Sequence, residues 1–330
     1  MLLKVNSQFD FYYKIRYFYK MILNLVIFCI SLFLVIKGAT LSTKYATGVA
    51  ESFGLSKYVV GFIIIAIISI LPETLITINS GLTGNPSFGL GTLLGSNVAD
   101  LTLVFVITVA VAKRGIKIES KIIKNNVIYP FILLLPIILG MDGSYTRLEG
   151  VILILIGLIF YFLAIRGGLT ENAEGLVPKS NKYKNSFYLL LSMVILLVGA
   201  HFTVTSATGL AENIGISPIF IGMFVVVLGT VIPELLFSVK AIKKNDDSLA
   251  VGDLLGTVLA DATIVVGLLA LITPFNFPVK IIYVTGVFMV MASFLLFYFM
   301  RSGKTLTQKE SFMLFMFWVL FVLIEVALNS

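Results

Sequence analysis

The chain of 330 residues has very few of the residues on which most metal and redox centres depend. It contains one cysteine, Cys29, and one histidine, His201, so it can form neither an intrachain disulfide nor a centre built from several of these side chains. Charged residues make up only 12% of the chain, against roughly 25% in an average soluble domain. Hydrophobic residues make up 58%. These proportions exclude an ordinary soluble protein and predict a protein that crosses a membrane many times.

Ten apolar stretches are long enough to cross a bilayer, which takes about 20 residues. They lie at 21–41, 57–80, 88–112, 125–141, 149–165, 186–211, 214–239, 248–273, 281–300 and 311–328. Inside a membrane the backbone must satisfy its own hydrogen bonds, which restricts spanning structures to helices and closed barrels. The alternating pattern of barrel strands is absent. The sequence therefore predicts an all-α polytopic membrane protein with ten transmembrane helices.

The basic residues predict the orientation of the chain, because cytoplasmic loops carry an excess of Lys and Arg. The loops after the odd-numbered stretches hold 17 of the 24 Lys and Arg residues, and the opposite face holds 6. We therefore expect a multi-pass protein of the plasma membrane with both termini outside. The net charge of +7 then reflects orientation, and no nucleic-acid partner is expected. Four of the exceptions lie in a basic, aromatic-rich tail at 1–20, which translation from Met21 would remove.

The second half of the sequence repeats the first at an offset of 161 residues. Residues 46–100 and 207–261 align without a gap and share 18 identities in 55 positions. We predict two repeats of five helices each, at 21–165 and 187–330, joined by a cytoplasmic linker at 166–186. Because five is an odd number, the second repeat crosses the membrane in the opposite sense to the first. Inverted repeats of this kind are typical of secondary transporters, which bind substrate near the midplane.

Carboxylates inside the apolar stretches are the strongest functional signal. A charged residue at the centre of a spanning helix costs about 2.5–3.5 kcal/mol. Four such acids occupy corresponding positions in the two repeats: Glu73, Asp100, Glu234 and Asp261. Lys37 is the only basic residue well inside a stretch, so the acids have no set of basic partners. Bound cations are the natural compensation, and a structural role with protonated or hydrogen-bonded acids is the alternative.

A proline precedes the glutamate in each repeat, as Pro72 before Glu73 and Pro233 before Glu234. An interior proline removes one backbone hydrogen bond, which frees the carbonyl oxygen four residues earlier. Hydroxyl side chains lie one helical turn before each of the four acids. These hydroxyls are Ser69, Ser96, Thr230 and Thr257. Carboxylates, carbonyls and hydroxyls are hard oxygen ligands, which suit Ca²⁺, Na⁺, Mg²⁺ or H⁺ rather than soft transition metals.

Three further polar residues receive structural interpretations. Asp253 corresponds to Thr92 in the first repeat and is expected near a helix start, where an acid favours the helix dipole. Glu325 is expected at the membrane interface. His201 corresponds to Thr40, which favours a packing or interfacial role over a ligand role. The glycines Gly91, Gly95, Gly252 and Gly256 are expected to permit close helix packing.

The segments 61–103 and 222–264 resemble the paired alpha-repeats of the calcium/cation antiporter superfamily, Na⁺/Ca²⁺ exchanger type. The family's Gly-Thr-Ser-Leu-Pro-Glu stretch matches 68–73 and 229–234, and its Gly-Asn-x-x-Gly-Ser-Asn stretch matches 91–97 and 252–258. The resemblance implies that Glu73 and Glu234 ligate Ca²⁺ with help from Ser69 and Thr230. It also implies that the carbonyls of two residues and the hydroxyls of two more serve flanking Na⁺ sites: Ala66, Val227, Ser96 and Thr257.

The chain departs from this family pattern at two corresponding positions. Ile70 and Val231 stand where the family has a serine that helps to hold Na⁺. The central glutamates are intact, so we expect Ca²⁺ antiport by alternating access, with Na⁺ or H⁺ as the counter-ion. Asp100 and Asp261 could carry protons. The open alternatives are an H⁺-coupled Ca²⁺ or Mg²⁺ exchanger and, from another class, a cation channel or a structural membrane protein. We expect no enzymatic activity, no cofactor and no obligate protein partner. The lipid bilayer and the transported ions are the expected partners.

Overall fold

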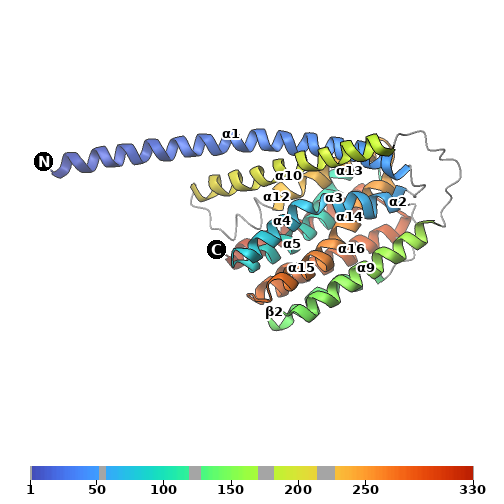
Figure 1. Ribbon diagram of the computed structural model, residues 1–330. Helices are drawn as coiled ribbons and strands as arrows, with labels where there is room; N and C mark the ends of the chain where they lie inside the picture. The colour runs from blue at the N-terminus through green and yellow to red at the C-terminus, as the bar shows by residue number, and fades with distance from the viewer. Residues whose placement is uncertain (1, 52–56, 119–127, 170–181, 214–226, 330) are drawn as a thin grey trace.

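The computed structural model describes residues 2–51, 57–118, 128–169, 182–213 and 227–329. It is a bundle of helices in which segments from the two halves of the sequence alternate (Figure 1). The predicted apolar stretches are helical nearly throughout the described residues. The linker residues 170–181 and the whole first half of the predicted stretch 214–239, residues 214–226, lie outside these residues.

Two long helices, α1 (Leu2–Glu51) and α10 (Lys182–Asn213), lie side by side along one edge of the bundle (Figure 1). Glycines let their backbones approach, because a Cβ on Gly38 would lie 2.7 Å from the backbone nitrogen of Leu196, and one on Gly199 would lie 2.8 Å from that of Val35. The helix α1 runs without interruption through residue 20. Residues 2–20 and the start of the first apolar stretch belong to one helix, whose first part extends beyond the bundle, and a separate tail at 1–20 remains a prediction.

The centre of the bundle consists of corresponding segments from the two halves. From the first half these are α2 (Lys57–Val59), η1 (Val60–Ile65), α3 (Ala66–Ser69), α4 (Leu71–Leu82), α5 (Pro86–Ala99), η2 (Asp100–Val104) and α6 (Phe105–Ala112). From the second half they are α12 (Val227–Thr230), α13 (Ile232–Lys243), α14 (Asp247–Ala260), η5 (Asp261–Val265) and α15 (Val266–Ile272). Most residues of α5 and α14 are buried, so these two helices form the core.

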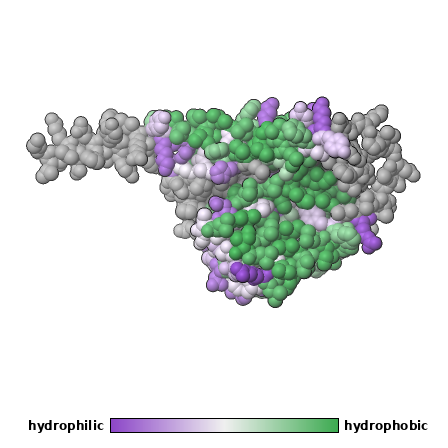
Figure 2. All heavy atoms as spheres, in the orientation of Figure 1, coloured by the Kyte–Doolittle hydropathy of each residue, from purple (hydrophilic) through white to green (hydrophobic). Residues whose placement is uncertain are grey.

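Peripheral helices surround this core. They are α8 (Ile128–Leu139) with the short turn η3 (Gly140–Asp142), α9 (Arg147–Leu169), η6 (Ile282–Gly286) continuing as α16 (Val287–Gly303), and α17 (Gln308–Asn329). Their outer faces carry large apolar side chains, such as Phe162 and Leu323, that are more than half exposed. Figure 2 shows apolar residues over most of the visible face of the bundle, with hydrophilic residues mainly at its margins. Such a surface is stable against lipid rather than water.

Seven helices of the described residues are long and apolar enough to cross a membrane, and an eighth span results if the bent pair at 61–82 is counted as one. A shorter apolar helix lies at Ile128–Asp142. The described part of the chain therefore has the helical, multi-pass character that composition predicts. The full count of ten spans remains a prediction.

Two small strand pairs qualify the all-α expectation. Strand β1 (Ile116–Lys117) pairs antiparallel with β4 (Thr305–Leu306), and β2 (Ser144–Tyr145) pairs antiparallel with β3 (Phe275–Asn276). The strands β2 and β4 each lead into a helix whose first turn is closed by a Thr-x-x-Glu capping box, at Thr146 with Glu149 and at Thr307 with Glu310. Both strand pairs join a loop of the first half to a loop of the second half.

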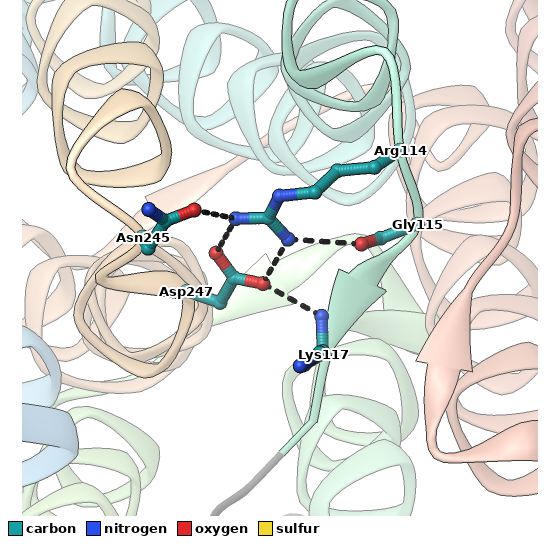
Figure 3. Close-up of polar contacts among 5 residues, drawn as sticks. All are labelled: Arg114, Gly115, Lys117, Asn245 and Asp247. Atoms are coloured by element: carbon teal, nitrogen blue, oxygen red, sulfur yellow. Dashed lines mark hydrogen bonds and ion pairs between the residues drawn. The ribbon is translucent and has the colours of Figure 1, made fainter.

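One ion pair also joins loops of the two halves. The guanidinium of Arg114, just after α6, donates two hydrogen bonds to Asp247 at the start of α14, at 2.6 and 2.7 Å (Figure 3). Asn245 and the carbonyl of Gly115 accept from the same guanidinium, and the backbone N–H of Lys117 donates to Asp247. The hydrogen bonds to Asp247 raise the pKa of Arg114 above its ordinary value. This arrangement fixes the loop after α6 against the start of α14.

Candidate cation-binding site

The helix breaks at the proline in each half. In the first half α3 ends at Ser69, α4 begins at Leu71, and the two segments differ in direction by 46°. Pro72 is the second residue of α4, where its missing N–H is tolerated. In the second half α12 ends at Thr230, and α13 begins at Ile232 and likewise has its proline in the second position. The sequence thus predicts both breaks correctly.

Both breaks have the same local geometry. The residue between the two helices has φ −71° and ψ −7° at Ile70, and φ −72° and ψ −11° at Val231. Each glutamate then lies in the first turn of the helix that follows, Glu73 in α4 and Glu234 in α13. A negative charge is favoured at a helix N-terminus by the dipole of the backbone. The two breaks therefore place the acids at equivalent helix starts.

Close packing brings α14 against the broken helix of the first half. A Cβ on Gly256 would meet the backbone of Phe62 and the side chain of Ala66, and one on Gly252 would lie 2.5 Å from the carbonyl oxygen of Tyr58. These two glycines have the packing role that the sequence predicts. At Gly91 a Cβ would meet no atom of the described residues within 4 Å, so the packing role is not seen there.

All ten residues that the sequence singles out as ligands are buried, with at most 4% of the surface of any of them exposed. They are Ala66, Ser69, Glu73, Ser96, Asp100, Val227, Thr230, Glu234, Thr257 and Asp261. The same is true of Asp253, whose exposed fraction is 0%. Five acidic side chains are therefore shielded from both water and lipid in the core of the bundle.

The two halves meet at Glu73. The hydroxyl of Thr230 has two acceptors in reach, the carbonyl oxygen of Val227 at 3.1 Å and the carboxylate of Glu73. Glu73 is also close enough to interact electrostatically with the acids Asp100, Glu234 and Asp261. The structure therefore brings together the four carboxylates that the repeat pairs in sequence.

Several oxygens of these acids have no hydrogen-bond partner among the described residues. They are one oxygen each of Glu73, Asp100 and Asp253 and both oxygens of Glu234 and Asp261. The hydroxyl of Thr257 is also unpartnered, whereas that of Ser96 donates to the carbonyl of Leu93 at 2.9 Å. Buried polar atoms are nearly always hydrogen-bonded or bound to an ion. So many unpaired oxygens in one region are suited to binding cations.

The described residues contain no group of three or more Asp, Glu, His or Cys side chains placed to hold one metal ion. A cation at this site can take its ligands from carboxylate, hydroxyl and carbonyl oxygens. Ca²⁺ takes 6–8 such oxygens, and bonds to backbone carbonyls are common. This arrangement differs from a preformed carboxylate cage and is consistent with a cation that binds and leaves.

Each of the two aspartates begins a π-helical turn, which the sequence analysis did not predict. Asp100 opens η2 and Asp261 opens η5. The wider turn interrupts the regular backbone hydrogen bonds of the helix. A threonine two residues after each aspartate donates its hydroxyl hydrogen bond to the carbonyl four residues before the threonine, Thr102 to Val98 at 2.5 Å and Thr263 to Leu259 at 2.6 Å. Turns of this kind are frequent at functional sites. The Asp-x-Thr spacing in both repeats is the signal that could have revealed them.

Two interpretations of the sequence are corrected by the structure. Asp253 is the seventh residue of α14, which begins at Asp247, so the helix dipole does not account for it. Glu325 is not at an exposed interface, because it is 1% exposed and accepts a hydrogen bond from Thr285 at 2.5 Å. His201 is exposed and packs edge to face against Phe202 at 5.3 Å, in keeping with the packing role expected for it.

Comparison with known proteins identifies similar chains and a similar solved structure. The chain is 25% identical over 268 residues to the inner membrane protein YrbG of Escherichia coli, covering 77% of this chain and 81% of the relative. It is 24% identical over 352 residues to the sodium/calcium exchanger MaX1 of Methanosarcina acetivorans, covering 91% and 98%. A solved structure of the sodium-calcium exchanger NCX_Mj superposes with a TM-score of 0.77 at 22% identity, over 92% of this chain and 98% of the other. That likeness establishes the fold.

The family model for the sodium/calcium exchanger protein matches the chain twice, at residues 23–166 and again at 184–327. The two matches leave out little besides the first residues and the connection between the halves. Each match contains one of the two helix breaks and one of the two π-helical turns that begin at an aspartate. The chain is a transporter of the membrane and belongs to the sodium/calcium exchanger protein family.

Proposed function

We propose that this chain exchanges Ca²⁺ for Na⁺ across the plasma membrane and that the transported Ca²⁺ binds between Glu73 and Glu234. One observation carries the proposal: both halves contain the same Pro-Glu break, and the two buried glutamates interact with each other and with no basic residue of the described chain. The relatives named as sodium/calcium exchangers support the choice of ions.

The ligand set of the central site follows from the helix breaks. Glu73 and Glu234 supply the charge, and Ser69 and Thr230 supply oxygens one turn earlier. The carbonyls near the breaks complete the shell, because the proline in each half donates no hydrogen bond. Ala66, Ser96, Val227 and Thr257 are positioned for flanking cations, with Asp100 and Asp261. Ca²⁺ is the cargo of the site, so its ligands are held apart until it binds.

We further infer that the two halves cross the membrane in opposite senses. The loops that carry β1, β4, Arg114 and Asp247 are all predicted to be cytoplasmic, and they contact one another. The loops that carry β2 and β3 are both predicted to be external, and they also pair with each other. Each contact joins loops assigned to the same side, which supports an inverted repeat. Such a repeat permits the site to open alternately to the two sides.

Proton coupling is a second candidate, because the five buried carboxylates carry more negative charge than one Ca²⁺ neutralises. The two candidates are distinguished by ⁴⁵Ca²⁺ uptake into proteoliposomes under separately imposed Na⁺ and H⁺ gradients. We expect an outward Na⁺ gradient to drive Ca²⁺ uptake without an H⁺ gradient. Uptake that follows only the H⁺ gradient would replace Na⁺ with H⁺, and absence of Ca²⁺ uptake under either gradient would contradict the proposed function.

A further inference from the structure

Among the buried acids of the described residues that interact around the central glutamates, Asp253 is the one that the repeat does not account for. It lies at the seventh position of α14, two turns from the start of the helix, and is fully buried. The corresponding residue of the first half, Thr92, is uncharged and donates its hydroxyl hydrogen bond to the carbonyl of Phe88 within its own helix at 2.9 Å. The acid therefore makes the two ends of the site chemically different.

The contacts of Asp253 lead to the helix break of the first half. The hydroxyl of Ser69 donates to Oδ1 of Asp253 at 3.2 Å. Ser69 is the last residue of α3 and lies four residues before Glu73. Asp253 also interacts electrostatically with Asp100 and with Glu234. It thus reaches the site from α14 and binds a hydroxyl beside the central glutamate.

The second carboxylate oxygen of Asp253 distinguishes a structural acid from a ligand. Oδ2 is buried and has no hydrogen-bond partner in the part of the chain that the structure describes. An acid retained only for structure is normally paired at both oxygens or, when protonated, donates to a neighbouring acceptor. Asp253 has neither arrangement, and no Lys or Arg of the described chain forms an ion pair with it. A small cation would satisfy the free oxygen.

Charge indicates which class of cation fits. Five buried carboxylates lie in the core, and one divalent cation neutralises two of them. The Asp253 end offers one carboxylate and one hydroxyl, a set with a single negative charge. A monovalent cation matches this charge, whereas a divalent cation is better matched by the pair of glutamates.

We propose that Asp253 and Ser69 form an additional binding position for Na⁺, on the first-half side of the Glu73/Glu234 centre and without an equivalent on the other side. This proposal rests on the proposed Ca²⁺/Na⁺ exchange. It makes the exchanger asymmetric, because one flanking position contains a carboxylate that the other lacks. Asp253 also supplies an oxygen to Ser69, the residue directly before Ile70, where the family has a hydroxyl and this chain does not.

The test is Asp253→Asn, which keeps an acceptor for Ser69 and removes the charge. In proteoliposomes we expect the Na⁺ half-saturation concentration for Ca²⁺ exchange to rise. Its fold-change should be at least ten times the fold-change of the Ca²⁺ half-saturation concentration. Thr92→Val at the corresponding position of the first half is the matched control, and its Na⁺ half-saturation should stay within twofold of the wild type. Should Asp253→Asn not fold, Asp253→Thr, which introduces the residue of the other half, is measured with the same expectation.

The outcomes separate this proposal from the proposed function. An unmodified chain without Ca²⁺ exchange under a Na⁺ gradient refutes the function itself. A functional chain whose Asp253→Asn variant binds Na⁺ as well as the wild type refutes the additional position alone. Equal losses for Na⁺ and Ca²⁺ in Asp253→Asn would also refute it, because they would show that Asp253 belongs to the shared central site.

Discussion

Removal of the charge of Glu234 is the most direct perturbation of the central site. Glu234 is fully buried and both of its carboxylate oxygens are unpartnered. The substitution Glu234→Gln preserves the shape of the side chain and breaks no protein hydrogen bond to the carboxylate. In the absence of cations its effect is therefore limited to the interactions of Glu234 with the neighbouring acids.

The magnitudes of two opposite effects follow from this environment. Repulsion between two carboxylates about 4–8 Å apart is about 2–4 kcal/mol at an effective dielectric constant of about 20. Loss of the repulsion with Glu73, Asp100 and Asp253 should leave the cation-free protein at least as stable as the wild type. Removing one partner of a buried charge pair costs about 3–5 kcal/mol. At 1.4 kcal/mol per tenfold change, Ca²⁺ affinity should fall by about two to four orders of magnitude.

Two measurements on the same purified variant test these magnitudes. Thermal unfolding in detergent with the Ca²⁺ chelated should give a midpoint at or above that of the wild type. Ca²⁺ titration of the same unfolding midpoint, together with ⁴⁵Ca²⁺ flux in proteoliposomes, should show the loss of affinity and of transport.

Glu325→Gln is the matched control, since Glu325 is also buried but accepts a hydrogen bond from Thr285. A glutamine preserves an acceptor there, so we expect Ca²⁺ flux close to that of the wild type. Near-normal flux in Glu234→Gln would show that this glutamate is structural and that the central site is wrongly placed. A lowered cation-free midpoint would contradict the inferred repulsion.

Three further predictions concern orientation, coupling and the contact between the halves. A cysteine introduced at Lys117 should be labelled by an impermeant reagent only from the cytoplasm and one at Asn276 only from outside; labelling of both from one side would refute the inverted repeat. Ile70→Ser combined with Val231→Ser should lower the Na⁺ half-saturation concentration, because each hydroxyl adds an oxygen ligand worth about 1 kcal/mol, and each kcal/mol corresponds to about a fivefold change. An unchanged Na⁺ half-saturation concentration in the flux assay would contradict this role. Arg114→Ala should lower the free energy of unfolding by about 1–2 kcal/mol, since the pair is partly solvent-exposed, and an unchanged unfolding midpoint in detergent would show that the pair adds nothing.

The helix breaks could be predicted because their cause is local. Pro72 and Pro233 end one helix and begin the next through the missing N–H, which is a property of the residue itself. The burial of Glu73 and Glu234 was equally predictable, because an acid inside an apolar helix has to face the protein interior. Because both repeats contain the Pro-Glu pair, the repeat in the sequence identifies both halves of the site.

The strand pairs and the ion pair of Arg114 with Asp247 could not be predicted in the same way. The partners of β1 and β2 lie more than 100 residues away along the chain, and loops of two or three residues carry no period that indicates pairing. Arg114 was counted for its charge in a predicted cytoplasmic loop, and its partner Asp247 lies at the start of a helix in the other half. These contacts depend on how the halves pack.

The sequence by itself determined the membrane-spanning helical class, the duplication and the four paired acids, because hydropathy, proline chemistry and the cost of buried charge act at each position independently of the fold. Only the tertiary structure decided that Asp253 joins this set. Its position in sequence suggested a helix start, and its partner, Ser69, lies 184 residues away in the other half. Close packing of α14 through Gly252 and Gly256 against the broken helix brings the two side chains together, and that proximity is a property of the assembled bundle.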